Sequence, residues 1–145
     1  MNKTIFNEYI DQGYNHIPVF REVVLDTDTA LGLYLKLANN TYSYLFESVQ
    51  GGEKWGRYSI IGLHAQTVIK VFDYEIQIEK DSNIIERFQV EDPLAWIEQY
   101  QQQFKVPEIA DLPEFNGGLV GYFGYEIIRY IEPKLKDIQL KDELN

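Results

Sequence analysis

The chain has 145 residues, of which 45% are hydrophobic and 14% aromatic, so we expect one globular domain and no extensive disorder. Its net charge of −10 and its lack of clustered Lys and Arg argue against nucleic acid and against an anionic membrane surface as partners. Without cysteine, the chain forms no disulfide framework and no zinc–sulfur site. Its start has no apolar leader and no run approaches the roughly 18 apolar residues of a spanning helix, so we expect a cytoplasmic protein.

Secondary structure can be predicted from helix caps and from the spacing of apolar side chains. Residues 26–29 offer N-caps before an apolar helical repeat over 31–38, and Asp92-Pro93 is typical of a second helix start. In chain order, we expect a strand at 16–24, a helix at 30–38, strands at 42–48 and 58–64, a hairpin at 67–72 and 74–79 turning near Asp73, a strand at 84–90, a helix at 92–104, a strand at 117–123, a short helix from about residue 125 and a frayed tail. The strands run in groups without regular β-α alternation. The sequence therefore predicts an α+β fold with a mostly antiparallel sheet, two main helices and a short C-terminal helix.

The most informative motif is Leu45-Phe46-Glu47-Ser48, followed after ten residues by Ser59. The two pieces lie on expected strands, on either side of a polar loop at 49–56 that contains three glycines. If the strands are neighbours, two hydroxyls and a carboxylate surround this loop. Carboxylate and hydroxyl oxygens accept hydrogen bonds from an ammonium group, while hydroxyls and free N–H groups donate hydrogen bonds to a carboxylate. A serine near a strand end usually bonds only the backbone, so it is the joint spacing that favours a site for a small zwitterion.

Strand alternation bears on the roles within this motif. Glu47 and Ser48 point to opposite faces of a regular strand unless a bulge intervenes. We therefore expect Ser48 to contact the ligand directly. Glu47 is then structural, paired with Arg57 or Lys54.

The glycine block Gly117–Gly124 does not have the spacing of a phosphate cradle, and no Gly-Lys-Ser/Thr follows it. We expect a strand whose glycines allow close backbone packing, with apolar residues at 119–123 that need cover on both faces. An uncovered patch there predicts self-association of the chain. His16 and His64, the only histidines, have no partner at metal-ligand spacing, so no metal site is expected.

These motifs resemble a known family. Leu45-Phe46-Glu47-Ser48 with Ser59 is similar to the tryptophan-sensing signature in the N-terminal domain of anthranilate synthase component I, which reads Leu-Leu-Glu-Ser, ten residues, then Ser. Residues 116–126 and 129–132 resemble the segment that closes that domain, and this segment is shared more widely among chorismate-using synthases. Phe46 replaces the second Leu, and a larger planar side chain there changes the wall that faces the indole.

The resemblance covers about residues 18 to 133. It implies that residues 1–133 are a regulatory domain, and that residues 134–145 are a charged linker toward a chorismate-binding domain that this chain lacks. The family makes anthranilate and pyruvate from chorismate, the first committed step of tryptophan biosynthesis, with ammonia from a glutamine amidotransferase subunit, component II.

The resemblance also implies the ligand and its contacts. L-Tryptophan would be the feedback inhibitor, bound by Ser48, Ser59 and Glu47, with Leu45 and Phe46 as an apolar wall. Magnesium and the catalytic residues are implied in the later domain. We therefore expect no cofactor in this chain and no catalysis by the chain alone.

Two alternatives stay open. Aminodeoxychorismate synthase component I has the same architecture and a different product, although the full signature favours anthranilate. The other alternative is a free-standing interaction module that uses the apolar strand at 118–123. A chorismate-domain sequence after residue 145 would favour the synthase, and a stop codon there would favour the module.

Overall fold

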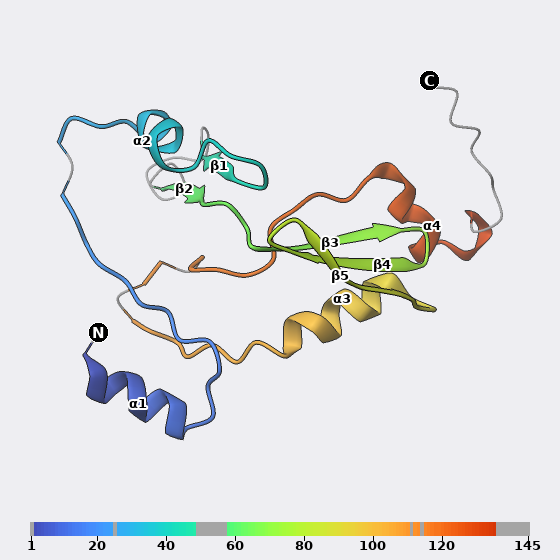
Figure 1. The fold of residues 1–145 in the computed structure, drawn as a ribbon, viewed down its shortest axis with the longest axis horizontal. Helices are drawn as coiled ribbons and strands as arrows, with labels where there is room; N and C mark the ends of the chain where they lie inside the picture. The colour runs from blue at the N-terminus through green and yellow to red at the C-terminus, as the bar shows by residue number, and fades with distance from the viewer. Residues whose placement is uncertain (1, 25, 49–57, 111, 114, 136–145) are drawn as a thin grey trace. The chain divides into compact units, whose positions relative to one another are not determined.

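The structure, a computed structural model, describes residues 2–24, 26–48, 58–110, 112–113 and 115–135 (Figure 1). The chain forms two compact units, Glu22–Gln89 and the combination of Met1–Arg21 with Val90–Asn145. All strand pairs in the described residues are antiparallel, and the helices do not alternate with the strands, which confirms the predicted α+β fold. None of the described helices is long and apolar enough to cross a membrane.

The unit Glu22–Gln89 begins with helix α2 (Ala30–Leu37), which is followed by the antiparallel pair β1 (Tyr44–Glu47) and β2 (Ser59–Gly62). As predicted, the helix cap comes from residues 26–29: the hydroxyl of Thr29 accepts the Gly32 N–H at 3.0 Å. The hydroxyls of Tyr34 and Ser43 lie 3.2 Å apart, which ties α2 to the residue before β1.

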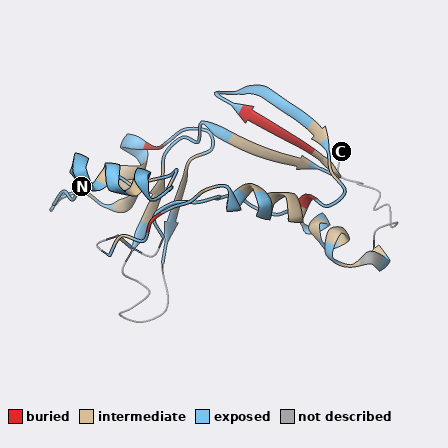
Figure 2. Ribbon diagram, turned by 90° about the horizontal axis from the view of Figure 1, so that it is seen from below, coloured by how far each residue is buried: buried red, intermediate tan, exposed pale blue. Residues whose placement is uncertain are grey.

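A three-stranded sheet completes this unit, with the order β3 (Thr67–Phe72), β4 (Glu75–Lys80) and β5 (Asn83–Gln89). The hairpin predicted to turn near Asp73 is confirmed. The next connection, Asp81-Ser82, has positive φ at both residues (49° and 66°), as a type I′ turn requires. Figure 2 shows the buried residues of this sheet gathered on its middle strand, where Ile76 is 0% and Ile78 7% exposed.

The other unit begins with helix α1 (Lys3–Asp11), which the sequence analysis missed. Asn2 caps its start by accepting the Ile5 N–H at 2.9 Å. The helix ends in a Schellman motif: Gly13 has φ +87°, its N–H donates to Ile10, and the Tyr14 N–H donates to Tyr9. The rings of Tyr9 and Tyr14 meet edge to face at 5.7 Å, the apolar contact that usually accompanies this motif.

Helix α3 (Pro93–Gln102) starts where Asp92-Pro93 predicted and ends two residues before the expected Phe104. The Asp92 carboxylate accepts the N–H groups of Leu94 and Ala95 at 2.9 and 3.0 Å. The short C-terminal helix is confirmed as the 3₁₀ turn η1 (Tyr125–Ile127) and α4 (Ile128–Ile131), followed by a second 3₁₀ turn, η2 (Pro133–Leu135).

Asn15 connects the ends of α1 and α3. Its side chain donates to the Gln103 carbonyl and accepts the Lys105 N–H, both at 2.7 Å. The ring of the next residue, His16, lies edge to face on Phe104 at 4.6 Å.

Two strand predictions are wrong. Residues 16–24 and 117–123 contain no assigned strand, and neither segment pairs with a described strand. Their β-branched and aromatic residues are individually suited to strands, but a strand needs a neighbour to take up its N–H and C=O groups. Of the charged tail predicted at 134–145, residues 136–145 lie outside the described part of the chain.

Candidate functional site

The β1–β2 pair brings together the two pieces of the Leu45–Ser48 and Ser59 motif. The register is regular: Glu47 lies opposite Ser59, Leu45 opposite Ile61, Phe46 opposite Ile60 and Tyr44 opposite Gly62. Ser48 follows the last paired residue directly and is exposed, as are Glu47 and Ser59. The structure therefore places a carboxylate and a hydroxyl side by side at the end of this ladder, with a second hydroxyl next along the chain.

The register also assigns the motif residues to faces. Because side chains alternate along a strand, Leu45, Glu47, Ser59 and Ile61 share one face, while Phe46 belongs to the other. The ring of Phe46 contacts that of Tyr44 at 4.7 Å between centroids and is 49% exposed. Lys54 and Arg57, the expected partners of Glu47, lie outside the described residues.

Gly62, at the other end of the β1–β2 ladder, is a structural residue of this strand pair that the sequence analysis passed over. The ring of Tyr44 lies over its backbone so closely that a Cβ at Gly62 would overlap three ring atoms. Only glycine leaves room for a cross-strand aromatic ring in this position. The feature that marks this glycine is its place opposite an aromatic residue. That place follows only from the strand register, which cannot be read from the sequence.

Residues just before β1 make contacts that hold the end of the β1–β2 pair at which β1 begins and β2 ends. The Ala65 N–H donates to the Tyr42 carbonyl at 3.1 Å, and Nδ1 of His64 lies 2.7 Å from the Thr41 carbonyl. Tyr42 has φ +56°, which is rare for a residue with a large side chain. The Nζ of Lys70, on β3, lies 5.6 Å from the centroid of the Tyr42 ring.

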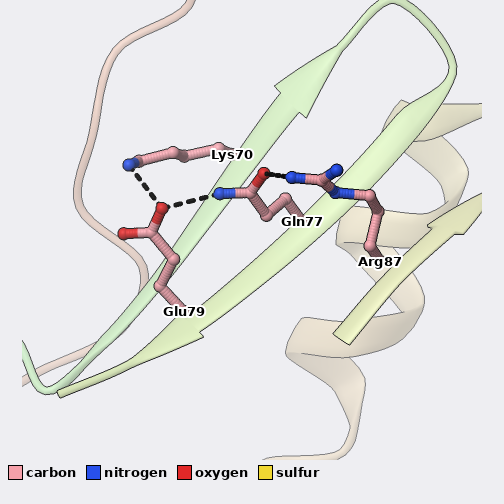
Figure 3. A network of polar contacts seen from close by, with 4 residues as sticks. All are labelled: Lys70, Gln77, Glu79 and Arg87. Atoms are coloured by element: carbon pink, nitrogen blue, oxygen red, sulfur yellow. Dashed lines mark hydrogen bonds and ion pairs between the residues drawn. The ribbon is translucent and has the colours of Figure 1, made fainter. Parts of the chain in front are cut away.

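Lys70 belongs to a polar network that crosses the three-stranded sheet (Figure 3). The Glu79 carboxylate accepts from Lys70 Nζ and from the Gln77 amide, both at 2.6 Å, and Arg87 donates to the Gln77 carbonyl oxygen at 2.9 Å. Arg87 also lies 3.4 Å from the Glu75 carboxylate. Gln77 and Glu79 are buried at 7% and 9% exposure, and no buried side-chain N or O atom of the described residues lacks a hydrogen-bond partner.

The charges of this network stabilise one another. The hydrogen bond from Lys70 lowers the pKa of the Glu79 carboxyl, with a smaller contribution in the same direction from Gln77. The hydrogen bond to Glu79 raises the pKa of Lys70, and the Tyr42 hydroxyl raises it further. Both groups therefore remain charged over a wider pH range than they would in isolation.

The glycine block lies in the other unit. Gly117 and Gly118 have φ +148° and +131°, and a Cβ at either of them, or at Gly121 or Gly124, would meet nothing within 4 Å among the described atoms. Among the described residues, therefore, nothing packs closely against these glycines, and backbone conformation explains the first two.

A cleft of about 490 Å³ borders the start of this block. Its lining among the described residues includes His16, Pro18, Phe104 and Leu119, and none of these described lining residues carries a carboxylate or ammonium group. Among the described residues, no group of three or more His, Asp or Glu is placed to hold a metal ion.

Comparison with known proteins finds no matching family model and no matching solved structure. Among curated proteins, the chain is 50% identical over 144 residues to the "Anthranilate synthase component 1" of Pseudomonas aeruginosa. It is 53% identical over 135 residues to that of Pseudomonas putida, and 48% identical over 142 residues to that of Acinetobacter calcoaceticus. The chain matches the N-terminal domain of anthranilate synthase component 1.

The match to this family confirms the resemblance drawn from the motifs. The three alignments cover 93–99% of the chain and correspond to the N-terminal domain of the family. The chain spans 27–29% of the length of these relatives.

Proposed function

We propose that this chain is the tryptophan-sensing regulatory part of an anthranilate synthase component 1, and that it makes no anthranilate by itself. The observation that carries this proposal is the cross-strand pair of Glu47 and Ser59, with Ser48 adjacent and all three exposed. A carboxylate beside a hydroxyl suits the two charged groups of a free amino acid.

In this proposal the ammonium of L-tryptophan donates to the Glu47 carboxylate, and the ligand carboxylate accepts from the hydroxyls of Ser59 and Ser48. Because Glu47 shares its face with Ser59, we now assign it to the ligand rather than to a purely structural role. Leu45, on the same face, is the apolar wall. Phe46 lies on the opposite face against Tyr44 and acts on the site through the strand.

Regulation would be a coupling between the tryptophan site and the chorismate site. If tryptophan favours a state in which the chorismate site is poorly formed, chorismate must weaken tryptophan binding by the same factor, typically about 5- to 150-fold. The chorismate site, magnesium and the amidotransferase component II belong to the proposed whole enzyme. The chain supplies the effector side of this coupling.

The experiment uses the 145-residue chain itself. With chorismate, ammonia and magnesium, we expect no anthranilate fluorescence. In an NMR titration with L-tryptophan, we expect shifts of the amides of Glu47, Ser48 and Ser59 with a Kd of about 1 mM or weaker, since the rest of the relatives' length contributes no contacts. D-Tryptophan is the control. Turnover of chorismate, micromolar affinity in calorimetry, or shifts that spare these three amides would contradict the proposal.

Of the two alternatives, aminodeoxychorismate synthase is disfavoured, because the curated relatives described above carry the anthranilate synthase name. A specific observation favours an interaction role as a second candidate. In the glycine block, Tyr122 is 93% and Phe123 66% exposed. Sedimentation of the chain tests this: self-association that Tyr122→Ser with Phe123→Ser abolishes would support it, and a monomer at all concentrations would exclude association through this segment.

A further inference from the structure

We infer that Lys70 is a positioning residue for the proposed effector site. It acts from β3, through the ring of Tyr42, on the conformation of the β1–β2 pair that presents Glu47 and Ser59. The consequence for ligand binding rests on the proposed function, whereas the structural coupling does not.

The inference starts from the backbone of Tyr42. Its φ of +56° is a conformation that bulky side chains seldom adopt, and such residues persist only where the surroundings hold them. Tyr42 lies two residues before β1, so its conformation sets the direction in which the chain enters that strand. A relaxed Tyr42 would change the start of β1 and hence the place of Glu47 and Ser59.

Two contacts hold Tyr42. On the backbone side, its carbonyl accepts the Ala65 N–H at 3.1 Å, which joins the segment before β1 to the segment after β2. On the side-chain side, Lys70 Nζ lies 5.6 Å from the ring centroid, within the range of a cation–π contact. Tyr42 is 45% exposed, so packing encloses its side chain only in part, and the contact with Lys70 adds a restraint.

Lys70 is itself fixed. Glu79 on β4 accepts its ammonium at 2.6 Å, and Gln77 holds the same carboxylate oxygen at 2.6 Å (Figure 3). The chain of contacts therefore runs from the centre of the three-stranded sheet to Tyr42, two residues before the β1–β2 pair. An exposed lysine without a partner would sample several rotamers and restrain nothing.

The test measures amide hydrogen exchange by NMR in the 145-residue chain, so it does not require a ligand. In Lys70→Met, we expect the Ala65 amide and the β1–β2 ladder amides to exchange about two- to fivefold faster, the factor for a partly exposed cation–π contact. The β4–β5 amides should change by less. Lys70→Arg keeps a cation over the ring and should restore slow exchange.

A double-mutant cycle separates positioning from a general loss of stability. If Lys70 acts through the ring of Tyr42, Lys70→Met adds little to the effect of Tyr42→Leu on the β1–β2 amides. Should Tyr42→Leu not fold, Glu79→Gln takes its place, because it frees Lys70 without touching Tyr42. Equal effects of Lys70→Met with and without the Tyr42 ring, or faster exchange confined to the β3–β5 sheet, would overturn the inference.

The effect of Lys70 on ligand binding is measured in a separate experiment. If the effector site is as proposed, Lys70→Met also weakens L-tryptophan binding by the same two- to fivefold factor, and Lys70→Arg does not. Faster exchange without any tryptophan binding in the parent chain would support the positioning role while refuting the proposed function. Tryptophan binding by the parent chain, without faster exchange in Lys70→Met, would support the proposed function and refute the positioning role.

Discussion

Glu47 and Ser59 lie directly opposite one another at the last pair of the β1–β2 ladder. Side chains of directly opposed residues are close enough to bind one small group together. This relation turns a spaced sequence motif into a local arrangement of charge and hydroxyl, and the proposed effector site depends on it.

The first prediction concerns this pair. We expect Ser59→Ala and Glu47→Gln, each in a chimera that carries this chain in the Pseudomonas aeruginosa relative, to raise the L-tryptophan concentration for half-inhibition by about 10- to 100-fold, as for hydrogen bonds to charged groups. Anthranilate formation without tryptophan should change little. Thr67→Ala, an exposed hydroxyl on β3, is the matched control. Unchanged inhibition in both variants would remove the pair from the site.

The second prediction concerns Gly62. A Cβ there overlaps the Tyr44 ring, so Gly62→Ala should lower the free energy of unfolding by about 1–3 kcal/mol, as measured in urea. Gly121→Ala is the control, because a Cβ at Gly121 would meet nothing within 4 Å. Adding Tyr44→Ala to Gly62→Ala should relieve the overlap. A destabilisation of equal size in Gly62→Ala and Gly121→Ala would show that the ring is not the cause.

The elements predicted correctly are those whose signals are local. Thr29 and Asp92 cap their helices through side-chain bonds to N–H groups two or three residues away. The strand after Asp73 alternates apolar and polar residues, and the hairpin needs only a two-residue connection. Such signals do not depend on the rest of the chain, so they can be read directly.

The errors come from interactions between distant residues. Residues 16–24 and 117–123 have strand-like composition, but pairing requires a partner that composition does not specify. For the site, the spacing of Ser48 and Ser59 indicated two strands with a polar loop between them, and the strands are neighbours, as the site requires. It did not give the register, and the register decides that Glu47 rather than Ser48 faces Ser59 and that Phe46 lies on the other side.

The third prediction concerns the end of α1, whose helix was missed although Asn2 and Gly13 mark its limits. Gly13 has φ +87°, so Gly13→Ala should cost about 1–2 kcal/mol in the free energy of unfolding, because an L side chain is strained there. Gly13→Asn should cost less, since Asn tolerates this conformation. Amide exchange of α1 reports the local effect, and equal exchange in Gly13→Ala and the parent chain would contradict the motif.

The fourth prediction concerns pH. Since Lys70 lowers the pKa of Glu79, the native state keeps this carboxylate charged at pH values where the unfolded state binds a proton. The contribution of Glu79 to stability is therefore present above its ordinary value of 4.5 and is lost as the pH falls through its lowered native pKa. For Lys70, whose pKa is raised, the contribution is complete below 10.5 and is lost as the pH rises through the native pKa.

Urea unfolding of the parent chain and Glu79→Gln across this range checks the sign. The difference in the free energy of unfolding between them should be largest between these limits and should shrink on acidification, because protonated Glu79 loses its ion pair with Lys70. Glu86→Gln, which removes an exposed carboxylate of β5, controls for net charge. The Arg87–Glu75 pair is unaltered in both variants, so any acid sensitivity that it causes cancels in the comparison. A difference that grows as the pH falls would mean that Glu79 is not stabilised in its charged form, and the anchoring of Lys70 would lose its physical basis.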